Sequence, residues 1–295
     1  MKRIYSLPDA GPVRIVNKVL LMGLQEHPDW FYDDFTIETA YGCPSTCIWN
    51  GGRFLETEDS HEDWQQKVLN FYASYGIKYR LIFTNCFLTK QHLKDGIGNA
   101  IASAVNKQGG YAMVSMGMMA DYLSRRYCNL TINWSTTTDF GPNVESQIKN
   151  INRLSARNLV VLPYQFNNKP ELLQCFLHPK ELEVMVNERC VDNCPYRREH
   201  WNNVSKMGIG MEDRFIKCSY HQARISGQIS SNMFHHIHRA QLAIYDSLGI
   251  NHFKIVGRNS IKQVLEAYLD HFVRPLFKQA FVACYNGLVN EQPRF

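Results

Sequence analysis

The sequence contains no long apolar run, and no window approaches the roughly 20 apolar residues that a membrane-spanning helix needs. The first segment, MKRIYSLPDAGPVRIV, carries basic residues but no apolar stretch like the core of a signal peptide. No run of like charges resembles a nucleic-acid-binding tail, and a net charge of +5 fits a solvated surface as well as an anionic partner. We therefore expect a cytoplasmic protein without membrane insertion.

Nucleotide-binding signatures are also missing, because no G-x-G-x-x-G or P-loop pattern follows any predicted strand. No internal repeat, low-complexity tract or obvious linker divides the chain. Its 295 residues are 45% hydrophobic and 20% charged, which suits a globular domain with a large core. We therefore predict one domain over residues 1–295.

Short β-rich runs alternate with segments of helical period. The predicted strands are Phe35–Glu38, Tyr79–Phe83, Tyr111–Met116, Asn129–Trp134, Leu159–Leu162, Glu181–Val186 and His252–Val256, with Ala223–Ile229 the weakest. The predicted helices are Trp64–Tyr75, Lys94–Lys107, Met119–Tyr127, Asn143–Ser155 and Met233–Leu248. This alternation predicts an α/β fold, a parallel (β/α)8 barrel of the TIM type that is irregular around its seventh strand.

Three segments lie outside the regular alternation. Residues 1–34 are expected to form an N-terminal extension with a helix that caps the bottom of the barrel, and 195–228 a long loop near the active face. Residues 261–295 are expected to form a helical tail.

The chain has nine cysteines, an odd number that excludes complete internal pairing. Active sites of such barrels lie at the carboxyl ends of the strands. Cys128, Cys175 and Cys284 fall elsewhere, and we expect them to be small buried hydrophobic residues. The remaining six follow strands and can converge above the barrel: Cys43, Cys47, Cys86, Cys190, Cys194 and Cys218.

The segment NERCVDNCPYRREH places Cys190 and Cys194 four positions apart on a loop. Thiolates spaced in this way can bind one metal centre, and 4Fe-4S clusters take four cysteine ligands. Cys218 is the expected third ligand and Cys43 the fourth, with Cys47 as the alternative. Zinc is the competing metal because His200 and His221 are near, and a site without metal remains open. Around one cluster the sulfurs of Cys190, Cys194 and Cys218 should lie within about 7 Å of one another.

Other polar residues also follow predicted strands, and we expect Asn85, Ser135, Asn187 and Lys254 to share one rim of the barrel. The candidates for substrate binding are Asn85, Ser135, Asn187, Arg197 and Arg258, the arginines because their fork matches carboxylate or phosphate. The candidate catalytic residues are Glu188, His200 and Lys254.

The segment ELEVMVNERCVDNCPYRREH, followed by Cys218 and then by LGINHFKIVGR, resembles the collagenase-like peptidase family, U32, over residues 158–260. The resemblance implies a barrel fold. It also implies an iron–sulfur cluster on Cys190, Cys194 and Cys218, with Cys43 added from barrel geometry. Several members of that family are oxygen-independent hydroxylases of ubiquinone precursors or RNA bases. The cysteine spacing here departs from that of the better-known members.

Three hypotheses follow. The first is an iron–sulfur enzyme that modifies a small molecule or an RNA base. The second is a peptidase-type hydrolase with Glu188 or His200 as the base, and the third is a non-enzymatic cluster-bearing subunit of a partner protein. If RNA is the substrate, one positive surface should be formed by Arg197, Arg198, Lys206, Arg214, Lys217 and Arg224.

Overall fold

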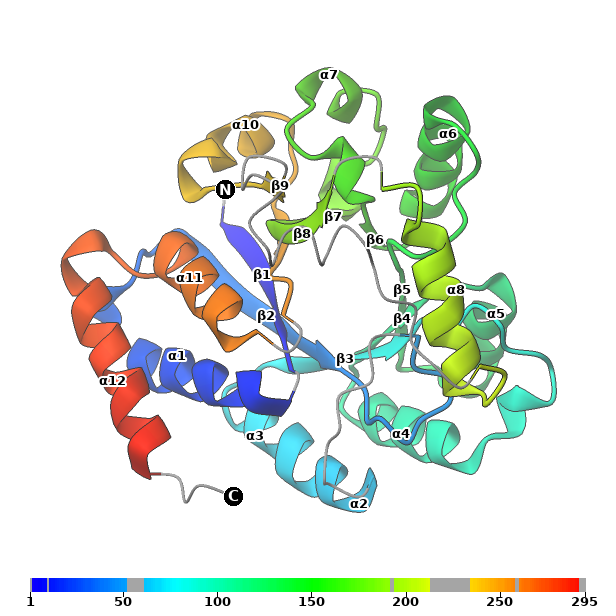
Figure 1. The fold of residues 1–295 in the computed structure, drawn as a ribbon, viewed down its shortest axis with the longest axis horizontal. Coiled ribbons are helices and arrows are strands. Elements are labelled where there is room, and N and C mark those ends of the chain that lie inside the picture. Colours follow the sequence, from blue (N-terminus) through cyan, green and yellow to red (C-terminus); the bar gives the residue numbers. More distant parts are fainter. Residues whose placement is uncertain are drawn as a thin grey trace.

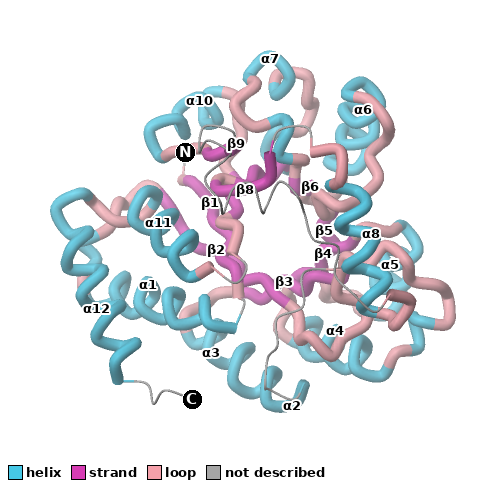
Figure 2. Tube along the Cα trace, viewed as in Figure 1, coloured by secondary structure: helices cyan, strands magenta, loops and turns pink. Residues whose placement is uncertain are grey.

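The structure is a computed structural model that describes residues 2–9, 11–51, 61–191, 194–212, 234–257 and 260–291. In these residues eight parallel strands close into a barrel with helices around it, which confirms the predicted fold class (Figures 1 and 2). Around the ring the strands follow the order β1, β10, β7, β6, β5, β4, β3, β2. The strand bounds are β1 Arg3–Pro8, β2 Phe35–Gly42, β3 Lys78–Phe83, β4 Tyr111–Val114, β5 Thr131–Trp134, β6 Val160–Val161, β7 Leu182–Met185 and β10 His252–Lys254.

The helices lie where the 3.6-residue period predicts most of them. Their bounds are α1 Arg14–Glu26, α2 His61–Trp64, α3 Asn70–Ser74, α4 Gly96–Lys107, α5 Gly117–Arg126, α6 Val144–Ser155, α7 Pro170–Leu173, α8 Arg197–Gly208, α10 Leu242–Ser247, α11 Ile261–His271 and α12 Lys278–Glu291. A π-helical turn at Gln65–Leu69 joins α2 to α3, so the helix predicted at Trp64–Tyr75 is present. No helix in the described residues is long and apolar enough to cross a membrane.

The N-terminal segment does not form the predicted extension. It supplies strand β1, which pairs with β10 on one side and β2 on the other, and then helix α1. In the run RIYSLP, Tyr5 and Leu7 pack in the buried hydrophobic cluster outside the strands, whereas the Ser6 hydroxyl reaches Glu183 of β7. Because β1 completes the ring, the residues that follow it lie at the active face of the barrel.

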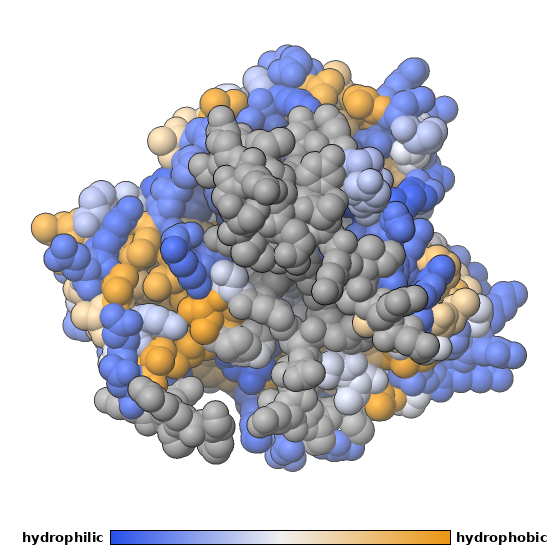
Figure 3. Space-filling model, in the orientation of Figure 1, coloured by the Kyte–Doolittle hydropathy of each residue, from blue (hydrophilic) through white to orange (hydrophobic). Residues whose placement is uncertain are grey.

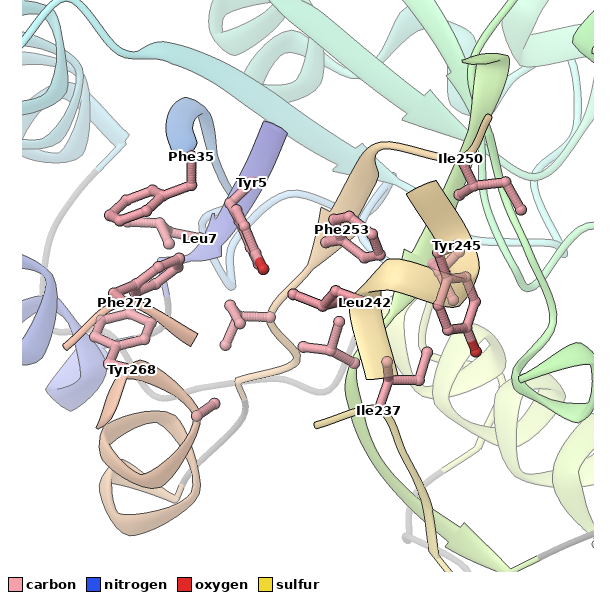
Figure 4. Packing of buried hydrophobic residues seen from close by; sticks show 14 of the residues in the cluster. Tyr5, Leu7, Phe35, Ile237, Leu242, Tyr245, Ile250, Phe253, Tyr268 and Phe272 are labelled. Carbon is pink, nitrogen blue, oxygen red and sulfur yellow. The ribbon is translucent and has the colours of Figure 1, made fainter. Parts of the chain in front are cut away.

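The core between β1, β10 and the surrounding helices is rich in aromatic side chains (Figure 4). The Tyr5 ring meets the Phe272 ring edge to face at a centroid distance of 4.8 Å and lies 5.5 Å from the Phe253 ring. The Tyr5 hydroxyl is 3.0 Å from Nδ1 of the buried His271. These contacts attach α11 to the first and last strands of the barrel.

The region after β7 departs from the prediction. A two-stranded antiparallel sheet outside the barrel pairs β8, Asn187–Val191, with β9, Phe234–His236. The helix predicted at Met233–Leu248 is therefore wrong at its start, since the helical part is α10. β7 pairs directly with β10, so the barrel closes without a strand from Ala223–Ile229, which lies outside the described residues.

Two further segments refine the prediction. Part of the region expected to be a long loop is helix α8 (Figure 1). The C-terminal tail is helical as predicted, but it consists of α11 and α12 separated by a 3₁₀ turn at Pro275–Phe277. On the face shown in Figure 3, apolar side chains gather over α1, α11 and α12, whereas α6 is mostly hydrophilic.

The cysteines assigned to the remote parts of the barrel are not buried. Cys128, Cys175 and Cys284 are all exposed free thiols, so the expectation that they pack as small hydrophobic residues is wrong. Cys128 and Cys175 lie in the turns after α5 and α7, and Cys284 lies on α12. Each lies in a surface turn or on an outer helix, where position relative to the barrel strands does not determine burial.

Candidate active site

A buried ion pair crosses the interior of the barrel. Nη1 of Arg80, on β3, donates to both carboxylate oxygens of Glu183, on β7, at 2.8 and 2.7 Å, and neither side chain is exposed to solvent. The Ser6 hydroxyl donates to the same carboxylate at 2.5 Å and accepts a hydrogen bond from Thr39 at 2.8 Å. Burial alone would raise the pKa of Glu183, but Arg80 and Lys254 more than offset it and hold that pKa low. The middle of the barrel is thus a rigid, charge-paired layer.

A cavity of about 150 Å³ lies at the mouth of the barrel, at the carboxyl ends of the strands. Its walls come from several strand ends and from the β1–α1 loop, and they include Asp9, Arg14, Tyr41, Cys43, Met113, Ser135, Thr136, Met185, Glu188, Trp201 and Lys254. This is the position where barrel enzymes place their active sites.

Lys254 is the last residue of β10 and is only 7% exposed. Its Nζ lies 3.6 Å from the centroid of the Tyr41 ring and 3.6 Å from Sδ of Met113. Among the described residues no carboxylate lies within ion-pair distance of this amine. Burial lowers the pKa of Lys254 to about 7; Glu183 opposes this shift and Arg80 adds to it. About half of the Lys254 side chains are therefore neutral amines at pH 7.

A second charged group lines the same cavity from the β1–α1 loop. Nε of Arg14 donates to Oδ1 of Asp9 at 2.9 Å. The Asp9 carboxylate also accepts hydrogen bonds from the hydroxyls of Tyr72 and Tyr79, at 3.0 and 2.8 Å. Burial opposes the charge on Arg14, yet attraction to Asp9 raises its pKa, so the guanidinium remains charged. The tyrosines fix Asp9, and Asp9 fixes the arginine.

Hydroxyl groups line the β5 side of the cavity. The Ser135 hydroxyl is 2.9 Å from Oγ1 of Thr137, which lies 2.5 Å from the Ser115 hydroxyl. Oγ1 of Thr136 is buried and has no hydrogen-bond partner among the described residues. An orphaned buried hydroxyl at a cavity wall is free to bind a ligand oxygen.

Glu188 lies on β8 and is 2% exposed. One carboxylate oxygen accepts the backbone N–H of Cys190 at 3.1 Å, and the other lies 3.6 Å from Nη1 of Arg197. The Arg197 guanidinium lies over the Tyr164 ring, 4.1 Å from its centroid. Burial raises the pKa of Tyr164, and both the Cys190 thiol and the Cys194 backbone act on its hydroxyl. The Cys190 side chain and the Cys194 backbone therefore both contact the Tyr164 hydroxyl.

A larger cavity of about 1000 Å³ adjoins the first and shares Thr136, Thr137 and Trp201 with it. Helix α8 contributes Arg197 and Arg198 to its wall, and the segment before α8 contributes Cys194. Arg198 forms an exposed ion pair with Asp139 at 2.5 Å on the opposite side. The two cavities together provide a small inner chamber and a wide polar vestibule.

The predicted site residues divide into groups. Ser135, Glu188, Lys254 and Cys43 line the inner chamber, and Arg197 and Cys194 line the vestibule. His200 lies on α8 and is not among the residues that line either cavity. Cys218 and Arg258 lie outside the described residues.

Asn85 and Asn187 follow strand ends as predicted, but they anchor the backbone. Asn85 donates to the carbonyl oxygens of Ile48 and Ser205, at 2.9 and 3.0 Å, which attaches α8 to the loops after β2 and β3. Asn187 exchanges two hydrogen bonds with the backbone of Val256, at 2.9 and 2.5 Å. These amides hold the rim together, and neither lines either cavity.

Sequence reasoning missed several residues of the inner chamber, among them Asp9, Arg14 and Tyr41. The signal that could have found the first two is the alternation in RIYSLP, which identifies a strand that ends just before Asp9.

The expected cluster ligands are only partly brought together in the described residues. Cys43 interacts with Cys47. Burial raises the pKa of the Cys43 thiol well above its usual value, and the interaction with Cys47 raises it further, so this thiol stays protonated. No group of three or more His, Cys, Asp or Glu side chains suited to a metal occurs among the residues that the structure describes. The described residues thus place Cys190 and Cys194 near each other and leave the rest of the predicted ligand set incomplete.

Comparison with known proteins finds similarity among solved structures. No known family profile matches the sequence, and no curated protein matches it. The structure is similar to that of the U32 peptidase Mk0906, with a TM-score of 0.53 and 13% sequence identity, over 88% of this chain and 94% of that chain. At this identity the likeness shows the fold alone: the chain has the barrel fold of a U32 peptidase over most of its length.

Proposed function

We propose that the chain is an enzyme that acts on a small molecule in the inner chamber, with Lys254 as its reactive group. One observation carries the proposal: a lysine amine is buried at the carboxyl end of a barrel strand, in a cavity wall, with no carboxylate partner among the described residues. An ammonium group in such a place is costly to desolvate, so a lysine there needs a functional reason.

The chamber supplies the other groups that such chemistry requires. A neutral lysine amine can accept a proton or attack an electrophilic carbon. Glu188 provides a second ionisable group in the same wall, and Ser135 and Thr136 provide hydroxyls that can orient a substrate. The inner chamber shares Thr136, Thr137 and Trp201 with the vestibule, so a substrate would reach the amine from that side.

The test is competitive acetylation with trace acetic anhydride at pH 6 to 10, followed by mass spectrometry of each lysine peptide. We expect half-maximal reactivity of Lys254 near pH 7, so its acetylation should reach a plateau within this range. If the reactivity of Lys254 is still rising at pH 10, as it does for a lysine with the unperturbed pKa of about 10.4, or if Lys254 reacts only after unfolding, the proposal fails.

A metal centre is a second candidate function, and the convergence of Cys190 and Cys194 on Tyr164 favours it. We propose that Cys190, Cys194 and Cys218 bind a 4Fe-4S cluster, with Cys43 as the fourth ligand and zinc as the alternative metal. A cluster would supply electron transfer for the modification of a small molecule or an RNA base, such as an oxygen-independent hydroxylation. The name of the structural neighbour is in keeping with peptidase-type hydrolysis as a further candidate, with Glu188 or His200 as the base.

Iron and sulfide analysis after anaerobic purification tests the cluster. Cys194→Ala should lose the iron, whereas Cys284→Ala, at an exposed position on α12, should retain it. Equal iron in both variants, or none in the parent protein, would exclude the cluster.

A further inference from the structure

We infer that the inner chamber binds small uncharged carbonyl compounds with an apolar body, and that Lys254 forms a Schiff base with their carbonyl carbon. This inference rests on the proposed role of Lys254 and adds the substrate class. It is carried by three features of one cavity: an apolar wall around the amine, charged neighbours that already have partners, and a small volume.

The wall beside the amine is apolar. Met113, Met185 and Val256 belong to one buried hydrophobic cluster, and all three line the chamber. Ile82 packs against this cluster and lines the chamber as well. Sδ of Met113 lies only 3.6 Å from Nζ of Lys254, so the apolar wall reaches the reactive group itself. Because apolar surface gains free energy when it leaves water, this wall favours a ligand with a hydrocarbon body.

The charged side chains in the same wall are bound to other residues. Apart from Lys254, the charged groups that line the chamber among the described residues are Asp9, Arg14 and Glu188. Nε of Arg14 donates to Asp9 at 2.9 Å, and the Glu188 carboxylate lies 3.6 Å from Nη1 of Arg197. A charged ligand would lose its hydration in the chamber and would have to compete with these partners. An uncharged ligand avoids that cost.

The surroundings of the amine suit the product of the reaction. A Schiff base on lysine is a cationic iminium when protonated, so a site that forms it must tolerate a positive charge at Nζ. The face of the Tyr41 ring, 3.6 Å away, provides that tolerance through a cation–π interaction. The ring is itself held in place, because its hydroxyl donates to the backbone carbonyl of Ile255 at 2.7 Å. Lys254 thus gains a group that accepts a cation and leaves the free amine easy to deprotonate.

The volume limits the ligand. A cavity of about 150 Å³ is the size that accommodates benzene in an engineered protein cavity, so the chamber suits molecules of roughly six to ten non-hydrogen atoms. Aldehydes and ketones of about five to nine carbons fall in this range. Larger substrates would have to extend into the vestibule.

The reaction balances with groups that line the chamber. The neutral amine of Lys254 adds to the carbonyl carbon, and a proton moves from nitrogen to oxygen to give a carbinolamine. The oxygen then takes up one proton from solvent, the C–O bond breaks, and the oxygen leaves as water while a C=N bond forms, which gives a cationic iminium. The Thr136 hydroxyl, in the same wall and without a hydrogen-bond partner among the described residues, can donate to the departing oxygen. No oxidant or reductant is consumed.

Reductive trapping with two aldehydes of equal size tests the inference. The protein is incubated at pH 7 with sodium cyanoborohydride and either 4-methylpentanal or succinic semialdehyde, in which a carboxylate replaces the isopropyl group. At this pH about half of the Lys254 amines are neutral, against roughly one in two thousand for a lysine of unperturbed pKa. Mass spectrometry measures the adduct on each lysine peptide. Each rate at Lys254 is divided by the rate at Lys262, whose side chain is 84% exposed, which removes the difference in intrinsic reactivity between the aldehydes.

We expect the normalised rate at Lys254 to be at least about tenfold higher with 4-methylpentanal, because the chamber favours the isopropyl group and gives the carboxylate no free partner. Lys254→Met should remove the fast phase of total adduct formation, and Lys262→Met should leave that phase unchanged. Equal normalised rates, or a higher one with succinic semialdehyde, would overturn the substrate class.

The acetylation experiment separates this inference from the proposed function. If the acetylation of Lys254 reaches its plateau as expected but neither aldehyde yields an adduct there, the Schiff base is refuted and a role as a base survives. If the acetylation of Lys254 is still rising at pH 10, the proposed function fails as well.

Discussion

Replacing Lys254 with methionine should stabilise the fold, by an amount that depends on pH. The folded-state pKa of Lys254 is about 7, against about 10.4 for an ordinary lysine, because the side chain is buried without a carboxylate partner among the described residues. Because folding lowers the pKa of this lysine, the unfolded chain binds the proton more tightly than the folded one. Proton binding therefore favours the unfolded state at every pH below the unfolded-state pKa. That cost is fully present below pH 7 and disappears as pH rises toward the unfolded value.

The size of the effect follows from the pKa difference. At 1.36 kcal/mol per pKa unit, the protonation of Lys254 lowers the free energy of unfolding of the wild-type protein by about 4 kcal/mol at pH 7. The reduction is about 2 kcal/mol at pH 9 and almost nothing near pH 10.5. Methionine is similar in length and carries no charge, so Lys254→Met should recover most of this, less about 1 kcal/mol for the lost contact with the Tyr41 ring.

Denaturant unfolding of both proteins at pH 6, 7, 8, 9 and 10 measures the difference directly. We expect the stability gain of the variant to shrink steadily above pH 7. Lys262→Met is the matched control, since its exposed side chain should change stability by no more than about 0.5 kcal/mol at any pH. A gain that is the same at every pH, or a loss of stability at pH 7, would refute the account of a neutral buried amine.

Three further outcomes follow from the described contacts. Glu183→Gln should destabilise the protein by about 3 to 5 kcal/mol in urea unfolding because it leaves Arg80 charged and buried, and a second change, Arg80→Met, should recover part of that loss; additive losses would contradict a buried pair. Asn187→Ala should cost about 1 to 3 kcal/mol, measured in the same way, because it leaves Val256 backbone groups unpaired; an unchanged midpoint would mean that this clamp is unimportant. In a native-state thiol titration, Cys47 should react only on unfolding; fast reaction is expected at Cys128, Cys175 and Cys284, and protection of these three would place them inside the protein.

The strands whose outward residues are apolar were predictable from the sequence, and β3, β4, β5 and β7 lie where the alternation places them. β1 was missed because its inward residue is Ser6, which belongs to the polar layer around Glu183. A barrel with a charged interior weakens the apolar signal that identifies a central strand, and the proline that ends RIYSLP weakens it further.

Helix α8 was missed for a different reason. Its buried residues are Asn203, Val204 and Ser205, so only one of the three is apolar and no apolar stripe marks the helix in the sequence. It is attached through hydrogen bonds, including the one from Asn85 to the Ser205 carbonyl. Helices fixed by polar contacts escape a search for hydrophobic period.

The candidate site was predictable as a rim but not as a set of roles. Ser135, Glu188 and Lys254, which follow predicted strands, line the wall of the inner chamber. The same rule could not separate them from Asn85 and Asn187, because an asparagine that binds a ligand and one that clamps the backbone look alike in sequence. The difference depends on which backbone groups lie within reach of each amide, and only the folded chain determines that.

The placement of β1 between β10 and β2 has a consequence for how the chain folds. Ile4 pairs with His252, so the ring closes only when segments nearly 250 positions apart meet. Arg3 reinforces this junction by binding both Asp34 and Asp246, at 2.5 and 2.6 Å. Contacts of such long sequence separation carry a high loop-closure cost and form late, so an early intermediate should hold β1 against β2 with its other edge unpaired. During that interval the exposed edge is a template for strands of other chains, and refolding yield should fall as protein concentration rises.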